Sequence, residues 1–147
     1  MCAGRGPLKA EIDAVANMQD IGFQSQASLK KLIREAKFVV VPSVVYESFG
    51  LSAIESISEG TPVLASDIGG LREILSESRA GVMFKSGNKK DLKETVKSLW
   101  VDTKLLDDLR INSRRHHMMV VGAYSKILLR KCYANGVLED EEESING

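Results

Sequence analysis

Short apolar runs alternate along the chain with longer stretches in which apolar residues recur every three or four positions. The run at residues 38–41, Phe-Val-Val-Val, has no polar position, which is typical of a parallel strand buried on both faces. The expected strands are residues 18–22, 38–41, 62–66 and 81–84, and the expected helices are residues 27–36, 50–59, 91–100, 104–116 and 123–134. This alternation predicts an α/β fold with a parallel sheet, helices on both faces and right-handed crossovers.

The charges of the chain are balanced, with 20 Lys and Arg residues against 20 Asp and Glu residues. A net charge of zero excludes a strong overall attraction to nucleic acid or to an anionic membrane surface. Basic residues gather late in the chain, at Lys104, Arg110, Arg114, Arg115, Lys126, Arg130 and Lys131. We interpret them as the solvated faces of helices, with a partner-binding patch as the alternative.

The last residues differ from the rest of the chain in composition. Residues 139–143 are all acidic, and we interpret residues 137–147 as an acidic, disordered tail. Since 147 residues correspond to one ordinary domain, residues 1–136 are expected to form a single domain.

The cysteines and the apolar segments indicate in which cellular compartment the protein is expected. Cys2 and Cys132 lie far apart and form no Cys-x-x-Cys motif, which excludes a disulfide framework and a zinc ribbon. No apolar stretch approaches the roughly 20 residues that cross a bilayer, and the first residues lack the apolar core of a signal peptide. We expect a cytoplasmic protein, peripheral at a membrane only through a domain absent from this chain.

Small and polar residues follow two of the expected strands, at residues 42–50 and 66–70. Open parallel sheets bind ligands beyond the carboxyl ends of their strands, so these segments are expected to line a crevice. The first segment runs into a helix that begins near Gly50, where unpaired N–H groups and the helix dipole favour a phosphate or diphosphate. Gly50 would let a ligand approach the backbone closely; the alternative is that it only relieves a tight turn.

Two acidic residues, Glu47 and Glu55, stand on either side of this helix start. The buried stripe of the helix is expected to contain Leu51, Ala53, Ile54 and Ile57. Glu55 falls at the edge of the stripe, where a carboxylate can accept hydrogen bonds from ligand hydroxyls. Carboxylates on both sides of an anion site suit a sugar and a ribose that are joined by a diphosphate. The alternative is that both are ordinary surface glutamates.

Several motifs occur in a fixed order over roughly residues 4–101. They are Gly-Arg-Gly-Pro at 4–7, Ile-Gly-Phe at 21–23, Glu-x7-Glu at 47–55, Gly-Thr-Pro-Val at 60–63, Gly-Gly-Leu-Arg-Glu at 69–73 and Gly-Val-Met-Phe at 81–84. The set resembles the retaining glycosyltransferases of family 4, and in particular the second, donor-binding domain of their GT-B fold. The resemblance implies a Rossmann-like domain that is incomplete here.

The resemblance also implies roles for individual residues. The donor would be a nucleoside-diphosphate sugar, whose sugar is transferred to an acceptor hydroxyl. Glu47 matches the first glutamate of the motif, a catalytic-site residue that contacts the donor-sugar hydroxyls, and Glu55 matches the second, which binds the ribose. The turn whose backbone N–H groups meet the sugar and the diphosphate is matched by Ser48, Phe49, Gly50 and Leu51.

The resemblance also implies a base pocket lined by Gly22, Phe23 and Gln24. Similar enzymes are metal-independent, so no metal ion and no cofactor are expected. The doublet His116-His117 is interpreted as part of a surface helix rather than as a metal site.

Part of the family pattern has no counterpart in this chain. The acceptor-binding first domain is absent, as are the opening strand and helix of the second domain, with the Arg and Lys that neutralise the diphosphate. In the strand order 3-2-1-4-5-6 the opening strand is central. The strand at 38–41 is therefore expected to expose an unpaired apolar edge, and the chain to be marginally stable alone or to receive the strand from a partner chain.

Two alternatives to a donor-binding half remain open. The chain could be a non-catalytic Rossmann-like subunit or scaffolding module that pairs with a separate chain. It could also be half of a nucleotide-sugar epimerase, an option that the surroundings of the Glu-x7-Glu motif disfavour.

Overall fold

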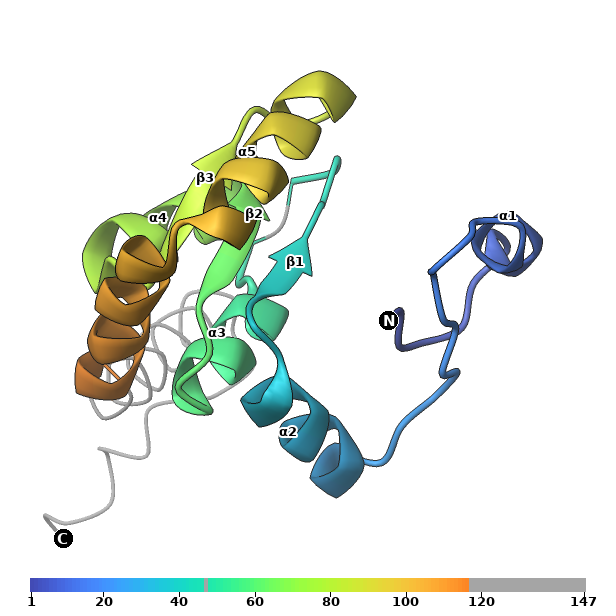
Figure 1. Ribbon diagram of the computed structural model, residues 1–147, viewed down its shortest axis with the longest axis horizontal. Helices are drawn as coiled ribbons and strands as arrows, with labels where there is room; N and C mark the ends of the chain where they lie inside the picture. The colour runs from blue at the N-terminus through green and yellow to red at the C-terminus, as the bar shows by residue number, and fades with distance from the viewer. Residues whose placement is uncertain (47, 117–147) are drawn as a thin grey trace, which may run out of the picture.

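A computed structural model describes residues 1–46 and 48–116 of the chain (Figure 1). The elements are α1 (Lys9–Asp13), α2 (Gln26–Glu35), β1 (Val39–Val41), α3 (Leu51–Ser58), β2 (Val63–Ser66), α4 (Gly69–Ser78), β3 (Gly81–Phe84) and α5 (Lys89–Val101). Residues 103–116 are also helical. The expected helix at 123–134 and the expected tail at 137–147 lie outside the described residues.

The three strands form a parallel sheet in the order β1-β2-β3, with Val39 opposite Val63 and Leu64 opposite Val82. The central strand β2 is fully buried because helices cover both faces of the sheet. One core lies between the sheet and helices α3 and α4, and includes Val41, Ala53, Ile57, Val63, Ala65, Leu71 and Leu75. The other lies between the sheet, α5 and residues 103–116, and includes Leu64, Phe84, Leu99, Leu106 and Leu109. The expected α/β fold is confirmed.

Side-chain caps decide where two of the helices begin. The Ser25 hydroxyl accepts a hydrogen bond from the Ser28 N–H at 3.2 Å, so α2 begins at Gln26. The Asn88 side chain accepts hydrogen bonds from the N–H groups of Lys90 and Asp91, both at 3.1 Å. Helix α5 therefore begins two residues before the expected position 91.

Two segments differ from the expectation. Residues 18–22 do not form a strand, because only Asp20 pairs, in an isolated parallel bridge with Cys2. Residues 69–78 form α4, a helix that the two glycines at its start made hard to predict, since glycine disfavours helices.

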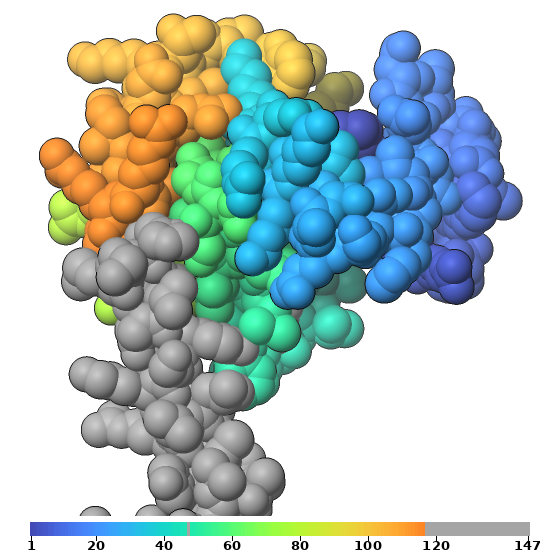
Figure 2. All heavy atoms as spheres, turned by 90° about the horizontal axis from the view of Figure 1, so that it is seen from below, coloured from blue at the N-terminus to red at the C-terminus, as the bar shows by residue number. Residues whose placement is uncertain are grey.

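The strand β1 lies at an edge of the sheet, and Val40 is 39% exposed there. No other strand of the described residues pairs with this edge, as expected, and the exposure of Val40 corrects the expectation that the whole strand is buried on both faces. Figures 1 and 2 place the N-terminal segment with α1, coloured blue, to one side of the molecule beyond β1.

Candidate functional site

The start of α3 is built around a glycine in a left-handed conformation. Gly50 is the N-cap residue of α3, with φ of 57° and ψ of 42°, and it is buried. A Cβ atom there would lie 2.9 Å from Ile74 Cδ1 and 3.0 Å from Leu71 Cδ2. A residue with a side chain would therefore meet both backbone strain and a steric clash at this position.

The first backbone N–H groups of α3 have no side-chain cap among the described residues. The N–H groups of Ala53 and Ile54 donate to the Gly50 carbonyl at 2.9 and 3.1 Å, which closes the first turn. The N–H groups before them are left at the positive end of the helix dipole, at the carboxyl edge of the sheet. Such an arrangement binds anions in other α/β proteins.

The two segments that were expected to line the crevice, residues 42–50 and 66–70, are in direct contact. A Cβ atom on Gly70 would lie 2.7 Å from the Ser48 carbonyl oxygen and 3.1 Å from the Phe49 nitrogen. The start of α4 thus packs against the loop that leads into α3, and Leu71 and Ile74 of the same helix contact Gly50. The sequence did not reveal this contribution of α4, although the Gly-Gly pair marks a site where backbones approach closely.

Polar groups at the carboxyl ends of the strands complete this edge of the sheet. The Ser86 hydroxyl donates to the Ser43 carbonyl at 3.2 Å and so links the segments that follow β3 and β1. Ser66, the last residue of β2, is buried, and its hydroxyl has no hydrogen-bond partner among the described residues. A water molecule or a ligand atom would satisfy it.

The structure distributes the expected turn residues over different environments. Ser48 is exposed, Phe49 is half-buried and Gly50 is buried, whereas Glu47 lies outside the described residues. Leu51 is 51% exposed, so its assignment to the buried stripe of the helix was wrong. As the first residue of α3, it lies at the open end of the helix rather than over the core. Ala53, Ile54 and Ile57 are buried as predicted.

Glu55 in α3 and Glu59, the C-cap residue of α3, lie one turn apart but have different surroundings. Glu59 is held by α2: its carboxylate accepts a short hydrogen bond from Arg34 Nε and lies 3.8 Å from Lys30 Nζ. Glu55 is half-buried, and no described residue forms an ion pair or hydrogen bond with its carboxylate. The carboxylate of Glu55 is therefore available to a ligand, and that of Glu59 is not.

Next to the second of these segments, residues 66–70, lies a basic residue that the sequence did not indicate as part of the site. Arg72, in the first turn of α4, forms an ion pair with Asp67 through Nε, and its Nη2 donates to the Asp67 carbonyl at 3.3 Å. The hydrogen bond to Asp67 raises the pKa of the Arg72 guanidinium above its ordinary value. The positive charge of Arg72 is thus already paired with a carboxylate.

The expected base-pocket residues lie in the N-terminal segment. Gly22 adopts φ of 61°, donates to Asp20 Oδ1 at 2.9 Å and accepts from the Gly4 N–H at 2.8 Å. Gln24 folds back, with a short hydrogen bond from Nε2 to the Ile21 carbonyl. Phe23 is 73% exposed, and the Arg5 guanidinium lies 5.9 Å from the centroid of its ring.

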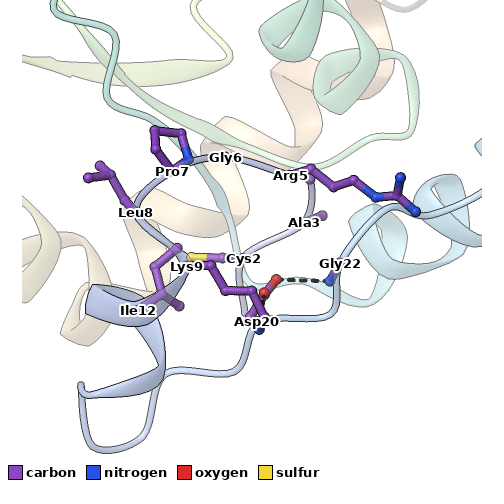
Figure 3. Close-up of a pocket in the computed structure, with 11 residues that line it drawn as sticks. Cys2, Ala3, Arg5, Gly6, Pro7, Leu8, Lys9, Ile12, Asp20 and Gly22 are labelled. Carbon is purple, nitrogen blue, oxygen red and sulfur yellow. Dashed lines mark hydrogen bonds and ion pairs between the residues drawn. The ribbon is translucent and has the colours of Figure 1, made fainter.

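Gly22 also lines a hollow of about 630 Å³ that the Gly-Arg-Gly-Pro loop encloses (Figure 3). Its other lining residues are Cys2, Ala3, Gly4, Arg5, Gly6, Pro7, Leu8, Lys9, Ile12 and Asp20. The Lys9 ammonium contacts Asp20 at 2.8 Å and Asp13 at 3.0 Å. The structure thus joins the two N-terminal motifs to each other, but places them beyond the open edge of β1 rather than beside the start of α3.

Residues 1–46 and 48–116 contain no group of three or more His, Cys, Asp or Glu side chains placed to hold a metal ion. Within the same ranges, no helix combines the length and apolar character needed to span a membrane. His117 lies outside the described residues, so the interpretation of the histidine doublet stays a prediction.

The chain is similar in sequence to a protein family and to individual glycosyltransferases. Residues 7–116 match the family model described as "Glycosyl transferases group 1". The chain is 33% identical over 117 residues to a D-inositol 3-phosphate glycosyltransferase of Jonesia denitrificans. The aligned region covers 78% of this chain and 27% of that protein. It is 47% identical over 62 residues to an uncharacterized glycosyltransferase of Methanocaldococcus jannaschii. That alignment covers 42% of this chain and 16% of that protein. The chain therefore spans less than a third of the length of these relatives.

Solved structures share the fold. Anabaena HepE in complex with UDP-glucose superposes with a TM-score of 0.70 at 19% identity, over 87% of this chain and 40% of that protein. Sucrose-phosphate synthase from Thermosynechococcus elongatus superposes with a TM-score of 0.65 at 28% identity, over 80% of this chain and 30% of that protein. The sheet and its helices thus have the architecture of GT-B glycosyltransferases.

Proposed function

Because this chain belongs to the group 1 glycosyltransferases, we propose that it is the donor-binding part of a retaining enzyme of family 4 type. In this proposal the whole enzyme transfers a sugar from a nucleoside-diphosphate sugar to an acceptor hydroxyl. The observation that carries the proposal is the start of α3. A buried left-handed glycine there brings uncapped backbone N–H groups to the carboxyl edge of a parallel sheet.

The diphosphate of the donor would bind at this helix start. The N–H groups of the turn at residues 48–51 would donate to the diphosphate and to the sugar, and the contact between Gly70 and Ser48 holds that turn in place. Because the donors are backbone groups in a packed turn, they need no reorganisation when the ligand binds.

The carboxylates would hold the hydroxyl-rich parts of the donor. Glu55, whose carboxylate has no partner among residues 1–46 and 48–116, would accept hydrogen bonds from the ribose hydroxyls, and Glu47 would contact the donor sugar. Gly22, Phe23 and Gln24 would line the base pocket. A nucleotide that reaches both the start of α3 and these residues must cross the open edge of β1.

The complete active site would also need groups from outside this chain. An acceptor-binding domain, in a longer polypeptide or a partner chain, would complete the active site. The leaving diphosphate would be stabilised by the helix start and by basic side chains, without a metal ion or cofactor. We place the enzyme in the cytoplasm, where nucleotide-activated sugars would serve as donors. A non-catalytic Rossmann-like subunit or scaffolding module that pairs with a separate chain is the second candidate.

Calorimetric titration tests the proposal with UDP, GDP, ADP and UDP-glucose as ligands. We expect a nucleoside diphosphate to bind, and Glu55→Ala to weaken it by about tenfold to a hundredfold, because hydrogen bonds to a charged group contribute about 1.5–3 kcal/mol. Glu59→Ala is the matched control. It removes the same side chain one turn later on α3, where Arg34 already holds the carboxylate, and should leave the affinity unchanged.

The outcomes separate the two candidates. Equal affinity of the parent chain and Glu55→Ala would refute the ribose role of Glu55. Absence of binding for every nucleotide, with a folded chain by circular dichroism, would favour the non-catalytic subunit.

A further inference from the structure

The outer surface of α5 concentrates positive charge. Helix α5 packs onto the sheet through Leu92, Val96 and Leu99. The exposed lysines of the helix are Lys89, Lys90, Lys93 and Lys97. At about 100° per residue they fall within roughly a third of the helix circumference, on the exposed side that adjoins the apolar stripe.

An exposed aromatic residue lies on the same side of the helix. Trp100 is 57% exposed and Val101 is 75% exposed. The indole of Trp100 is held from the protein side: Phe38 packs edge-on at 6.1 Å between ring centroids, and Lys37 Nζ lies 4.6 Å from the indole centroid. The same ammonium donates to the Trp100 carbonyl at 2.7 Å. The ring is therefore fixed in place and still open to an outside partner, with a further cation beside it.

Acidic residues of α5 offset little of this charge. Glu94 is exposed and lies 4.0 Å from Lys90 Nζ. The Asp91 carboxylate is half-buried and accepts a hydrogen bond from the backbone N–H of Lys85. The lysines Lys89, Lys93 and Lys97 have no acidic partner among the described residues.

We propose that this surface, the α5 basic face of Lys89, Lys90, Lys93, Lys97 and Trp100, binds the anionic surface of a lipid bilayer. Indole rings favour the level of the lipid headgroups, and nearby lysines are attracted by anionic lipids. The apolar stripe of α5 is already used in the core, so the helix does not insert. The contact is electrostatic with one aromatic anchor.

Two observations favour a bilayer over a nucleic acid as the partner. The face contains lysines and no arginine, whereas arginine is the residue that binds phosphates of nucleic acids in a bidentate manner. The exposed Trp100 and Val101 are adjacent, which suits an interface with an apolar side. The zero net charge of the chain does not oppose the contact, because screening over about 8 Å makes local charges decisive.

The test uses a property of the chain itself: Trp100 is its single tryptophan, so intrinsic fluorescence reports on this face alone. Vesicles of phosphatidylcholine and phosphatidylserine should shift the emission to shorter wavelengths and sediment the protein, and pure phosphatidylcholine vesicles should not. The variant Lys93→Gln/Lys97→Gln should lower the partition coefficient by about 25-fold, at about fivefold for each lysine. The control Lys30→Gln/Lys31→Gln changes the net charge equally on α2 and should bind as the parent chain does.

Three results would overturn the proposal, with circular dichroism showing that each variant is folded. One is an emission spectrum that anionic vesicles leave unchanged. Another is an equal loss in both double variants, which would mean that the total charge alone governs binding. The third is an equal affinity and an equal emission shift with a single-stranded oligonucleotide, which would make the face a general polyanion site. None of these results depends on donor binding at α3.

Discussion

At Gly50 the backbone turns from the loop after β1 into α3, and the turn depends on the absence of a side chain. The sequence predicted a helix start at this glycine and left open whether it serves a ligand or a tight turn. It could not predict the contact with Leu71 and Ile74, because these residues come from α4, which begins 19 positions later along the chain. The exposure of Leu51 was missed for a related reason: a helical wheel places a residue on a face but does not say where the core ends.

Replacing Gly50 separates the steric and conformational parts of this requirement. Gly50→Ala should lower the free energy of unfolding by about 2–4 kcal/mol, since the new Cβ meets Ile74 and the residue must keep a positive φ. Gly87→Ala is the control: Gly87 has φ of 72° with no atom within 4 Å of the Cβ position, so its cost should be about 1–2 kcal/mol. Urea unfolding of the three proteins gives the comparison. Equal costs would show that the packing against α4 contributes nothing.

The elements divide into those that local patterns predict and those that need their neighbours. The strands β2 and β3 and helices α2 and α5 follow from apolar runs, apolar periodicity and turn residues, and all are present. Helix α4 was missed because its glycines oppose helix formation locally, while the buried Leu71 and Leu75 stabilise it through the core. Residues 18–22 were expected to form a strand, but in the structure only Asp20 is paired, in the bridge with Cys2.

The loop that carries Gly22 should respond to pH through Asp20. Hydrogen bonds from Lys9 and from the Gly22 N–H lower the pKa of the Asp20 carboxyl below its ordinary value of 3.8. A lowered pKa in the folded state means that the stabilisation is complete above the unfolded value and is lost as the pH falls through the folded value. The Gly22 amide resonance should therefore titrate with a midpoint below 3.8.

Lys9→Ala provides the matching variant for this titration. It removes the ammonium group whose hydrogen bond lowers the pKa of Asp20 most and keeps the Gly22 hydrogen bond, so the midpoint should rise toward 3.8 without reaching it. A Gly22 amide that titrates at or above 3.8 in the parent chain would contradict the assignment.

On the scale of the whole molecule, the described residues form a three-stranded sheet and an N-terminal segment beyond its open edge. In parallel strands the polar groups of successive residues point to alternate sides. The Val39 N–H donates to Pro62 on the side of β2, so the N–H and C=O of Val40 point toward the open edge. The family resemblance predicted this edge. The separation of Gly22, Phe23 and Gln24 from the start of α3 could not be read from the motifs, because their spacing along the chain does not say how far apart they lie in the fold.

The open edge should make the chain associate or unfold readily. We expect light scattering after size exclusion to show a mass that rises with concentration, or thermal unfolding to be broad. Val40→Lys should suppress association, because a charged side chain at an edge opposes pairing with another strand. Val44→Lys, at an exposed position after the strand, is the control and should associate as the parent does. A monomer that unfolds in one sharp transition would show that the edge needs no partner.

The Ser48 carbonyl oxygen occupies the place where a side chain at position 70 would begin. The loop that leads into α3 and the first turn of α4 therefore cannot be redesigned separately, although Ser48 and Gly70 are 22 positions apart in the chain. A library that varies residues 48–51 has to keep glycine at position 70 or vary it at the same time, because any larger residue there requires the Ser48 carbonyl to move.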